Sequence, residues 1–251
     1  MKIQNFPTDM LARETAQIIN EKLKKAGGSS QNKPFLLMLS GGSSLALLDH
    51  IDTNLINDRI TLSVLDERYS TNPIENNYSL ICTTDFYKKA VDAGAHFIDT
   101  SVRVGETLEQ HASRFADALK KWRKENPQAD IIATMGIGPD GHIAGIMPYP
   151  EDRSLFKELF EGTSWITGYD ARNAAGVKKN SFSLRTTPTM TFIRENITCA
   201  ISYVTGENKK SALNNVLADS DDSPSSYPLA KIPARILREI KDATIVTDLR
   251  Y

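Results

Sequence analysis

Short apolar runs recur along the chain, each of a length typical of one buried β-strand. The five clearest runs are Phe35–Leu39, Ile60–Leu65, Asp130–Met135, Ile197–Val204 and Ala243–Thr247. Between them lie stretches with apolar residues at helical spacing or with many charges, which favours surface helices. One predicted helix begins near Thr8, and three others cover Leu45–His50, Glu106–Lys124 and Asn208–Leu217. Strands are therefore expected to alternate with helices along the chain.

This alternation indicates the class of fold. Strands that are continuously apolar are buried on both faces, which favours a mostly parallel, Rossmann-like sheet with helices on both faces. We expect a single α/β domain over residues 1–251, and a small lobe inserted between Tyr149 and Asn180 stays open as an alternative. Thr8 is predicted to cap the first helix, and the polar stretch Asp219–Ser226 is predicted to be a surface loop.

Composition narrows the range of partners. The 251 residues are 40% hydrophobic and 24% charged, which indicates an ordinary globular protein rather than a disordered one. The formal net charge of -1 gives no bulk electrostatic reason to expect nucleic acid or an anionic membrane as a partner. An anionic ligand must instead meet a few locally placed basic groups.

The two cysteines and the first residues favour a cytoplasmic location. Cys82 and Cys199 are far apart and lack the spacing of metal ligands, so we expect two reduced thiols and no metal site. Residues 1–7 show no apolar secretory segment, and no apolar run approaches the ~20 residues of a membrane span.

The most informative stretch is the glycine-rich loop that follows the run Asp130–Met135. Three of its residues are glycines, which allow sharp turns and close approach of a ligand. His142 lies on this loop, two residues after Asp140, and histidine suits proton transfer near neutral pH. We predict that His142 is a general base oriented by Asp140, with a structural histidine bonded to backbone as the alternative.

The same loop matches the dinucleotide pattern Gly-x-Gly-x-x-Gly. That pattern normally opens the first strand–helix–strand unit of a fold, whereas here it lies past the middle of the chain. Asp140 would also place a negative charge near a pyrophosphate. We therefore predict no nicotinamide cofactor, and no other cofactor.

A second glycine-rich loop, Ser40–Ser44, separates a predicted strand from a predicted helix. Gly41 and Gly42 expose backbone N–H groups at a helix N-terminus, and Ser43 and Ser44 add hydroxyl donors. This arrangement predicts a cradle for a phosphate or carboxylate, with a plain tight turn as the alternative.

Charged residues at other strand ends extend the candidate site. Asp66 and Arg68 follow the run Ile60–Leu65, where they would face a ligand or form a solvated ion pair. Arg185 and Lys209 lie on candidate strand ends or loops, and each alone is more often a surface charge. Together with the Ser40–Ser44 loop they would supply the cations that a phosphate dianion needs.

The order of these motifs resembles a known sugar-phosphate family. The motifs are Ser-Gly-Gly-Ser, Asp-Glu-Arg, Asn77-Tyr78, Gly-x-Gly-x-Asp-Gly-His and Thr-Gly-x-x-Lys. They are similar to those of the family that contains 6-phosphogluconolactonases and glucosamine-6-phosphate deaminases, over nearly the whole chain. Two residues favour the lactonase branch: Arg68 stands where the deaminases have tyrosine, and Met147 where they have a glutamate. Ile143, Gly145 and Leu45 depart from the usual lactonase pattern.

The resemblance implies hydrolysis of 6-phospho-D-glucono-1,5-lactone to 6-phosphogluconate. In this interpretation His142 activates water, Asp140 orients His142, and Arg68 stabilises the oxyanion. The phosphate is then expected to contact the hydroxyls of the Ser40–Ser44 loop and the cations of Arg185 and Lys209. Asp66 is expected to contact the sugar hydroxyls. The alternatives are a deaminase and a non-catalytic phosphosugar-binding protein. We expect the protein to be a monomer or a small homo-oligomer.

Overall fold

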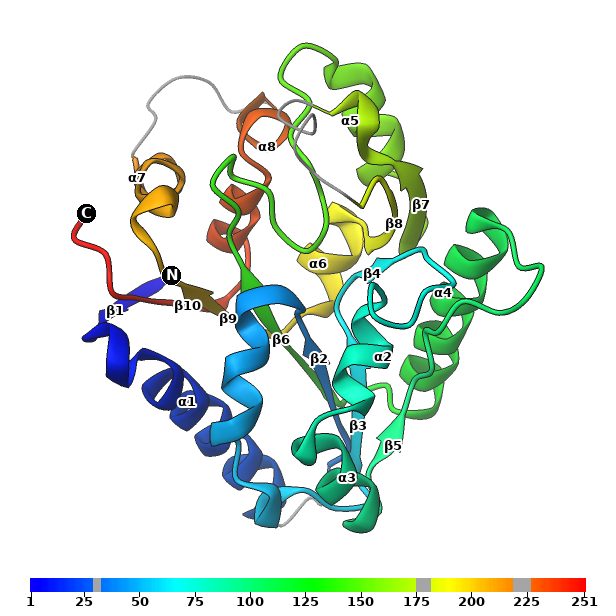
Figure 1. The fold of residues 1–251 in the computed structure, drawn as a ribbon, viewed down its shortest axis with the longest axis vertical. Helices are drawn as coiled ribbons and strands as arrows, with labels where there is room; N and C mark the ends of the chain where they lie inside the picture. The colour runs from blue at the N-terminus through cyan, green and yellow to red at the C-terminus, as the bar shows by residue number, and fades with distance from the viewer. Residues whose placement is uncertain (29–32, 175–181, 219–226) are drawn as a thin grey trace.

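The computed structural model describes residues 1–28, 33–174, 182–218 and 227–251 (Figure 1). Its main sheet has seven strands in the order β1-β10-β9-β6-β2-β3-β5, and every pair is parallel. The strands are β1 (Lys2–Asn5), β2 (Phe35–Leu39), β3 (Ile60–Val64), β5 (His96–Phe97), β6 (Asp130–Gly136), β9 (Cys199–Val204) and β10 (Asp242–Thr247). The predicted class of fold is therefore confirmed.

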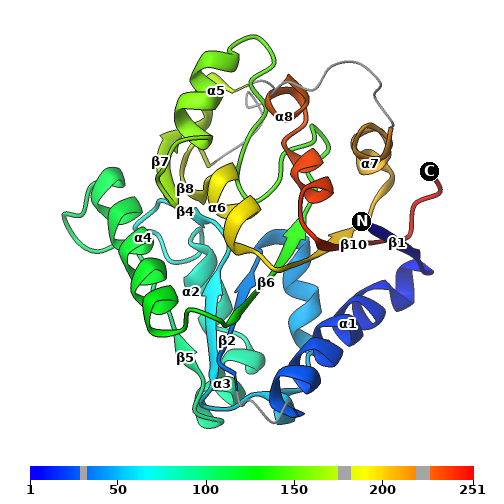
Figure 2. The ribbon, with the colours of Figure 1, turned by 180° about the vertical axis from the view of Figure 1, so that it is seen from behind.

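Helices cover both faces of this sheet. Figure 1 shows the 3₁₀ helix Gly42–His50 and α2 in front of the strands, and Figure 2 shows α4 and α6 on the opposite side. The α-helices are α1 (Thr8–Gly28), α2 (Asn77–Cys82), α3 (Asp85–Asp92), α4 (Leu108–Glu125), α5 (Arg153–Phe160), α6 (Met190–Asn196), α7 (Lys210–Leu217) and α8 (Tyr227–Lys231). The described residues also form the 3₁₀ helices Thr53–Leu55, Ala171–Asn173, Glu207–Lys209 and Pro233–Arg238. In the described part of the chain, no helix is long and apolar enough to span a bilayer.

A second, antiparallel sheet was not predicted. It has the order β4-β8-β7, built from β4 (Glu67–Arg68), β8 (Leu184–Pro188) and β7 (Ile166–Asp170). Its strands contain threonine, glycine, proline and charged residues rather than a continuous apolar run, so they lack the pattern that revealed the main sheet. The expectation of one sheet was therefore incomplete.

Two local predictions differ from the structure. Thr8 is the first residue of α1 rather than its cap, and its hydroxyl donates to Asp248 at 2.8 Å. Leu45–His50 belongs to a 3₁₀ helix that starts at Gly42. The predicted loop Asp219–Ser226 lies outside the described residues.

The order of strands creates one topological switch point. From β2 the chain proceeds outward through β3 and β5, and from β6 it proceeds the other way through β9 and β10. The strands β2 and β6 are adjacent, and the loops that follow them leave the same edge of the sheet in opposite directions. Open α/β sheets bind ligands at such a point.

Candidate functional site

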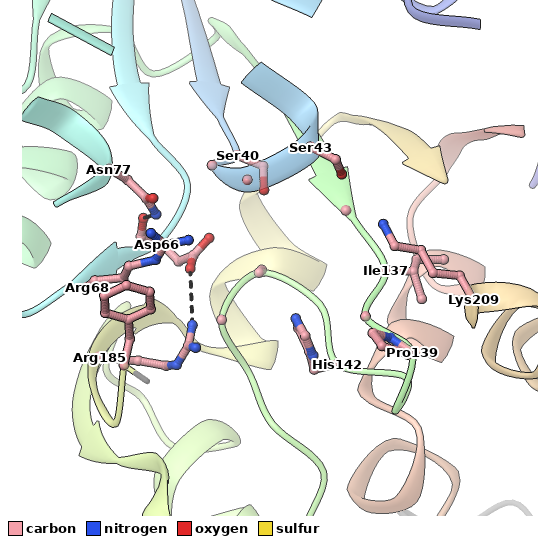
Figure 3. Close-up of a pocket in the computed structure, with 17 residues that line it drawn as sticks. Ser40, Ser43, Asp66, Arg68, Asn77, Ile137, Pro139, His142, Arg185 and Lys209 are labelled. Carbon is pink, nitrogen blue, oxygen red and sulfur yellow. Dashed lines mark hydrogen bonds and ion pairs between the residues drawn. The ribbon is translucent and has the colours of Figure 1, made fainter. Parts of the chain in front are cut away.

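A cavity of about 300 Å³ lies at this switch point (Figure 3). It is lined by the loops after β2 and β6, by β4 and β8 of the second sheet, and by the turn that precedes α7. Eight of the predicted site residues line it, namely Gly41, Gly42, Ser43, Asp66, Arg68, His142, Arg185 and Lys209. Asp140 and Ser44 do not line the cavity directly.

His142 and Asp140 form a hydrogen-bonded pair. Nδ1 of His142 lies 2.6 Å from Oδ1 of Asp140, and the same oxygen accepts the backbone N–H of His142 at 3.1 Å. Burial opposes ionisation of Asp140, but the hydrogen bonds and charge of His142 outweigh it, so the pKa of Asp140 lies below its ordinary value. An ionised Asp140 holds the proton on Nδ1 and leaves Nε2 of His142 as the basic nitrogen.

The loop that carries His142 is braced on both sides. The backbone N–H of Gly138 donates to the carbonyl of His142 at 2.9 Å, closing the turn around Asp140. Further along, Ala144 has a φ of 51°, a left-handed conformation that costs a non-glycine residue free energy. Its carbonyl accepts a hydrogen bond from the Thr187 hydroxyl of β8, and Tyr169 of β7 donates to the carbonyl of Gly145 at 2.5 Å. The small sheet therefore fixes the conformation of the histidine loop.

This geometry bears on the dinucleotide alternative. A phosphate-binding glycine loop opens directly into a helix, whose N-terminus holds the pyrophosphate. Here the chain after Gly141 forms bridges between Ile143 and both Ile137 and Ile146, and the next helix begins only at Arg153. The loop thus lacks the element that would hold a dinucleotide.

The Ser40–Ser44 loop forms another wall of the cavity. Gly42 has a φ of 63°, which glycine adopts without strain, and the backbone N–H of Ser40 is held by the Thr134 hydroxyl of β6 at 2.9 Å. Ser43 faces the cavity (Figure 3). Ser44 does not line the cavity: it is 2% exposed, its hydroxyl lies near Gly136, and that hydroxyl has no hydrogen-bond partner among the described residues. The predicted contact of Ser44 with a ligand stays a prediction.

Asp66 and Arg185 are both buried beside the cavity. Their closest charged atoms are 4.0 Å apart. Burial raises the pKa of Asp66, although Arg185, Arg68 and His142 oppose that change. Nε of Arg185 is buried and has no described partner. Unpaired buried donors are costly, so a ligand or water that met Arg185 would bind favourably.

Glu67, between Asp66 and Arg68, does not reach the cavity. Its carboxylate accepts the backbone N–H groups of Arg68, Asn77 and Tyr78 at 2.8, 2.5 and 2.9 Å, and the Thr100 hydroxyl at 3.1 Å. Burial raises the pKa of Glu67 to about 8, and these hydrogen bonds only partly offset it. Glu67 therefore joins β4 to the start of α2 and holds Arg68 and Asn77 in place.

The cations are distributed on two sides of the histidine. In Figure 3, Arg68 and Arg185 lie on one side of His142 and Lys209 lies on the other, near Ser43. Burial lowers the pKa of Lys209, with Asp248 opposing the change. The cavity thus offers two separate positions for oxygen atoms that carry negative charge.

Several lining residues were not predicted as site residues. Asn77 was noticed only as part of a motif; it is buried, donates to the carbonyl of Asp66 at 2.9 Å, and lies against Gly41. Phe182 had no signal in the sequence, because a single aromatic residue in a loop predicts nothing by itself. Among the described residues, no group of three histidine, cysteine, aspartate or glutamate side chains is close enough to hold a metal.

The fold and the cavity define a class of proteins with a histidine–aspartate pair and cationic side chains at the switch point of a parallel sheet. The family model for glucosamine-6-phosphate isomerases and 6-phosphogluconolactonases matches residues 7–245. The chain belongs to this family, and the resemblance seen in the motifs is confirmed.

Individual relatives agree with the family assignment. A probable 6-phosphogluconolactonase of Dictyostelium discoideum is 32% identical over 149 residues, which cover 58% of this chain. The alignment spans only 55% of that relative's length. The crystal structure of a 6-phosphogluconolactonase from Shewanella baltica OS155 has a TM-score of 0.73 at 21% identity, covering 98% of this chain and 96% of that one. The 6-phosphogluconolactonase of Trypanosoma brucei has a TM-score of 0.70 at 19% identity, covering 98% and 95%. These two likenesses show the fold.

Proposed function

We propose that this protein hydrolyses 6-phospho-D-glucono-1,5-lactone to 6-phosphogluconate, the second step of the oxidative pentose phosphate pathway. The observation that carries the proposal is the His142–Asp140 pair, whose imidazole faces a cavity with cationic side chains on both sides. A lactone is an activated ester, so a base that activates water is sufficient for its hydrolysis. The names of the relatives support this choice of reaction.

In the proposed mechanism Nε2 of His142 takes a proton from a water molecule as its oxygen attacks C1 of the lactone. Asp140 stabilises the imidazolium that results. The carbonyl electrons move to the oxygen, and Arg68 stabilises this oxyanion. When the intermediate collapses, the bond from C1 to the ring oxygen breaks and the ring oxygen takes the proton from His142. Water is thus added across the ester bond and the histidine is regenerated.

The substrate phosphate is placed against the wall formed by Ser43, the backbone of Gly41 and Gly42, and Lys209. Backbone N–H groups at a helix start and an ammonium group both favour a phosphate dianion. Arg185, which we expected at the phosphate, lies beside Asp66 and across His142 from Lys209, so we assign Arg185 and Asp66 to sugar oxygens instead. This arrangement holds C1 near His142 through contacts made far from the reacting atom.

The deaminase is the second candidate, and Met147 is the observation against it. Met147 is 1% exposed, and its backbone N–H donates to the hydroxyl of Tyr169 at 3.2 Å. A thioether cannot transfer a proton as the carboxylate at this position does in the deaminase branch. A phosphosugar-binding protein without activity is the third candidate, and measured turnover of the lactone would exclude it.

The test measures release of acid from freshly prepared lactone and release of ammonia from glucosamine-6-phosphate. We expect acid release well above the spontaneous hydrolysis in a blank without protein, and no release of ammonia. His142→Gln should lower kcat by about 10²- to 10⁴-fold, the usual contribution of one acid–base group. His50→Gln, a change to an exposed histidine outside the cavity, is the matched control and should have no effect. Full activity in His142→Gln would remove His142 as the base.

We further propose a cytoplasmic location, a small-molecule substrate as the partner, and no requirement for nucleic acid, membrane or cofactor. The near-zero net charge and the two free cysteines support these proposals. The assembly, a monomer or small homo-oligomer, stays a prediction that sedimentation would test.

A further inference from the structure

Arg68 and Arg185 form a directly opposed pair across the antiparallel strands β4 and β8. Like charges at such positions repel each other and destabilise a sheet. Asp66 lies 4.0 Å from Arg185 and relieves the repulsion on that side. Among the described residues, no carboxylate lies within 4.0 Å of the Arg68 guanidinium. Arg68 is therefore held by another kind of contact.

That contact is the aromatic ring of Phe182. The guanidinium carbon of Arg68 lies 4.3 Å from the centre of the ring, within the range of a cation–π interaction. The only hydrogen bond described for the guanidinium is a long one, 3.4 Å from Nη1 to the carbonyl of Glu75. Phe182 also lines the cavity, so the ring and the guanidinium share the same wall.

Arg114 shows the opposite arrangement. Its Nε lies 2.6 Å from a carboxylate oxygen of Glu106, and its two terminal nitrogens donate to the carbonyls of Asp99 and Ser101 at 2.7 Å. These contacts neutralise its charge and occupy its donors, which suits a structural arginine. A ring face, by contrast, fixes a guanidinium without neutralising it and leaves the N–H donors in its plane available.

We infer that Phe182 is the positioning residue of Arg68. Its ring holds the guanidinium at the edge of the cavity, with its positive charge and its N–H groups, other than the one that reaches Glu75, available to an anionic oxygen of a phosphosugar. Phe182 comes from the segment that also delivers Arg185, three residues later, so one stretch of chain arranges both arginines. The inference rests on the proposed function only in taking a phosphosugar as the ligand.

The test is an aromatic series at position 182, made with Arg68 present and with Arg68→Met. The readouts are the affinity for 6-phosphogluconate by calorimetry, kcat/KM for the lactone, and the melting temperature. Phe182→Leu should lower affinity and kcat/KM by about 2- to 30-fold, the range expected of one cation–π contact. Phe182→Trp and Phe182→Tyr should stay within about 3-fold of the natural protein, because both rings attract cations.

The double variant separates positioning from a purely structural role. With Arg68→Met, Phe182→Leu should cause no further loss beyond about 2-fold, since the cation is absent. An equal loss with and without Arg68, or an unchanged affinity in Phe182→Leu, would overturn the inference. If the natural protein binds 6-phosphogluconate and shows this coupling but does not hydrolyse the lactone, the proposed function fails and the role of Phe182 stands.

Discussion

Gly138 lies against the imidazole of His142, the proposed general base. A Cβ at this position would lie 2.0 Å from Nδ1 and 2.1 Å from Cε1 of His142. Gly138→Ala must therefore push the ring away from Asp140, and kcat should fall by about 10²-fold or more, as for loss of a general base. Steady-state kinetics beside a melting curve would check this.

Gly162→Ala is the matched control for that experiment. Its Cβ would meet its nearest neighbour, the carbonyl of Glu158, at 3.9 Å, which is ordinary contact. This variant should keep full activity. Equal kcat values for Gly138→Ala and the natural protein would show that the histidine does not need its observed position.

Lys209 is expected to act on binding rather than on the chemical step. Lys209→Met should raise KM by about 10- to 100-fold, the range for a lost hydrogen bond to a charged group, with kcat little changed. Because burial lowers the pKa of Lys209, KM of the natural protein should begin to rise at a lower alkaline pH than an ordinary lysine would allow. Lys210→Met, whose side chain lies outside the cavity, is the control. A KM that is unchanged in Lys209→Met removes Lys209 from the phosphate site.

Side-chain direction is where sequence reasoning about single residues reached its limit. Ser43 and Ser44 are equivalent donors in the sequence, yet the 3₁₀ helix that begins at Gly42 turns Ser44 toward the sheet, near Gly136. Asn77 is the reverse case: its role depends on the carbonyl of Asp66 and on Gly41, which only the folded chain brings to it. Residue types predicted which chemistry is present, and backbone geometry decided which groups reach the cavity.

At the scale of elements, β7 and β8 stabilise the histidine loop through single hydroxyl groups. Tyr169→Phe removes the hydroxyl that bonds the carbonyl of Gly145 and the N–H of Met147, and leaves both buried groups without that partner. The free energy of unfolding should fall by about 1–3 kcal/mol, and kcat should fall with it because the loop carries His142. Urea denaturation and kinetics on the same samples would measure both.

Tyr149→Phe provides a closely matched control. Both tyrosines are buried and pack against Phe160, but the hydroxyl of Tyr149 has no described partner. Its removal should change the free energy of unfolding by less than about 0.5 kcal/mol, or stabilise the protein. If the two variants lose the same stability, the hydroxyl of Tyr169 does not brace the loop.

The elements differ in how well the sequence predicted them. The central strands β2, β3 and β9 are buried along their whole length and β6 at all but its two end residues, so their apolar runs were visible. The strands β7 and β8 are shaped by hydrogen bonds and by the loops they brace, and β4 has only two residues. Strands without a continuous apolar pattern are determined by tertiary contacts, which a single sequence does not display.

For the whole molecule, the sequence predicted parallel strands but not their order. A strand that is apolar at nearly every position is buried on both faces, so the residues of each strand indicate helices on both faces of the sheet. The strands β2 and β6 are adjacent in the sheet, although β3, β4 and β5 lie between them in the chain, so their pairing depends on packing between distant segments. The loops after β2, β3, β6 and β9 could nevertheless be expected to meet, because the ends of parallel strands lie at one edge of the sheet. The positions of Arg68 and Arg185 depend instead on the antiparallel pair β4 and β8, which the sequence did not reveal.

Two carboxyls, the buried Glu67 and the partly buried Glu106, are expected to give the stability of the molecule opposite slopes with pH. The ordinary pKa of a glutamate is 4.5. A hydrogen bond from Arg114 lowers the pKa of Glu106 to about 2 and outweighs the effect of burial. Burial raises the pKa of Glu67 to about 8. The stability that Glu106 contributes is present above pH 4.5 and is lost as pH falls toward 2. Glu67 holds its proton longer in the folded state, so its contribution is present below pH 4.5 and is lost as pH rises through 8.

These signs can be tested by urea unfolding at a series of pH values. Each group contributes a slope of at most about 1.4 kcal/mol per pH unit in its own range. Glu67→Gln should lower stability below pH 4.5, because at least one backbone N–H loses its acceptor, and should flatten the decline between pH 4.5 and 8. Glu106→Gln should flatten the acid side alone. Glu158→Gln, an exposed carboxyl on α5, should leave both slopes unchanged. If Glu67→Gln kept the full decline toward pH 8, Glu67 would be ionised in the folded protein, and its four hydrogen bonds would outweigh its burial.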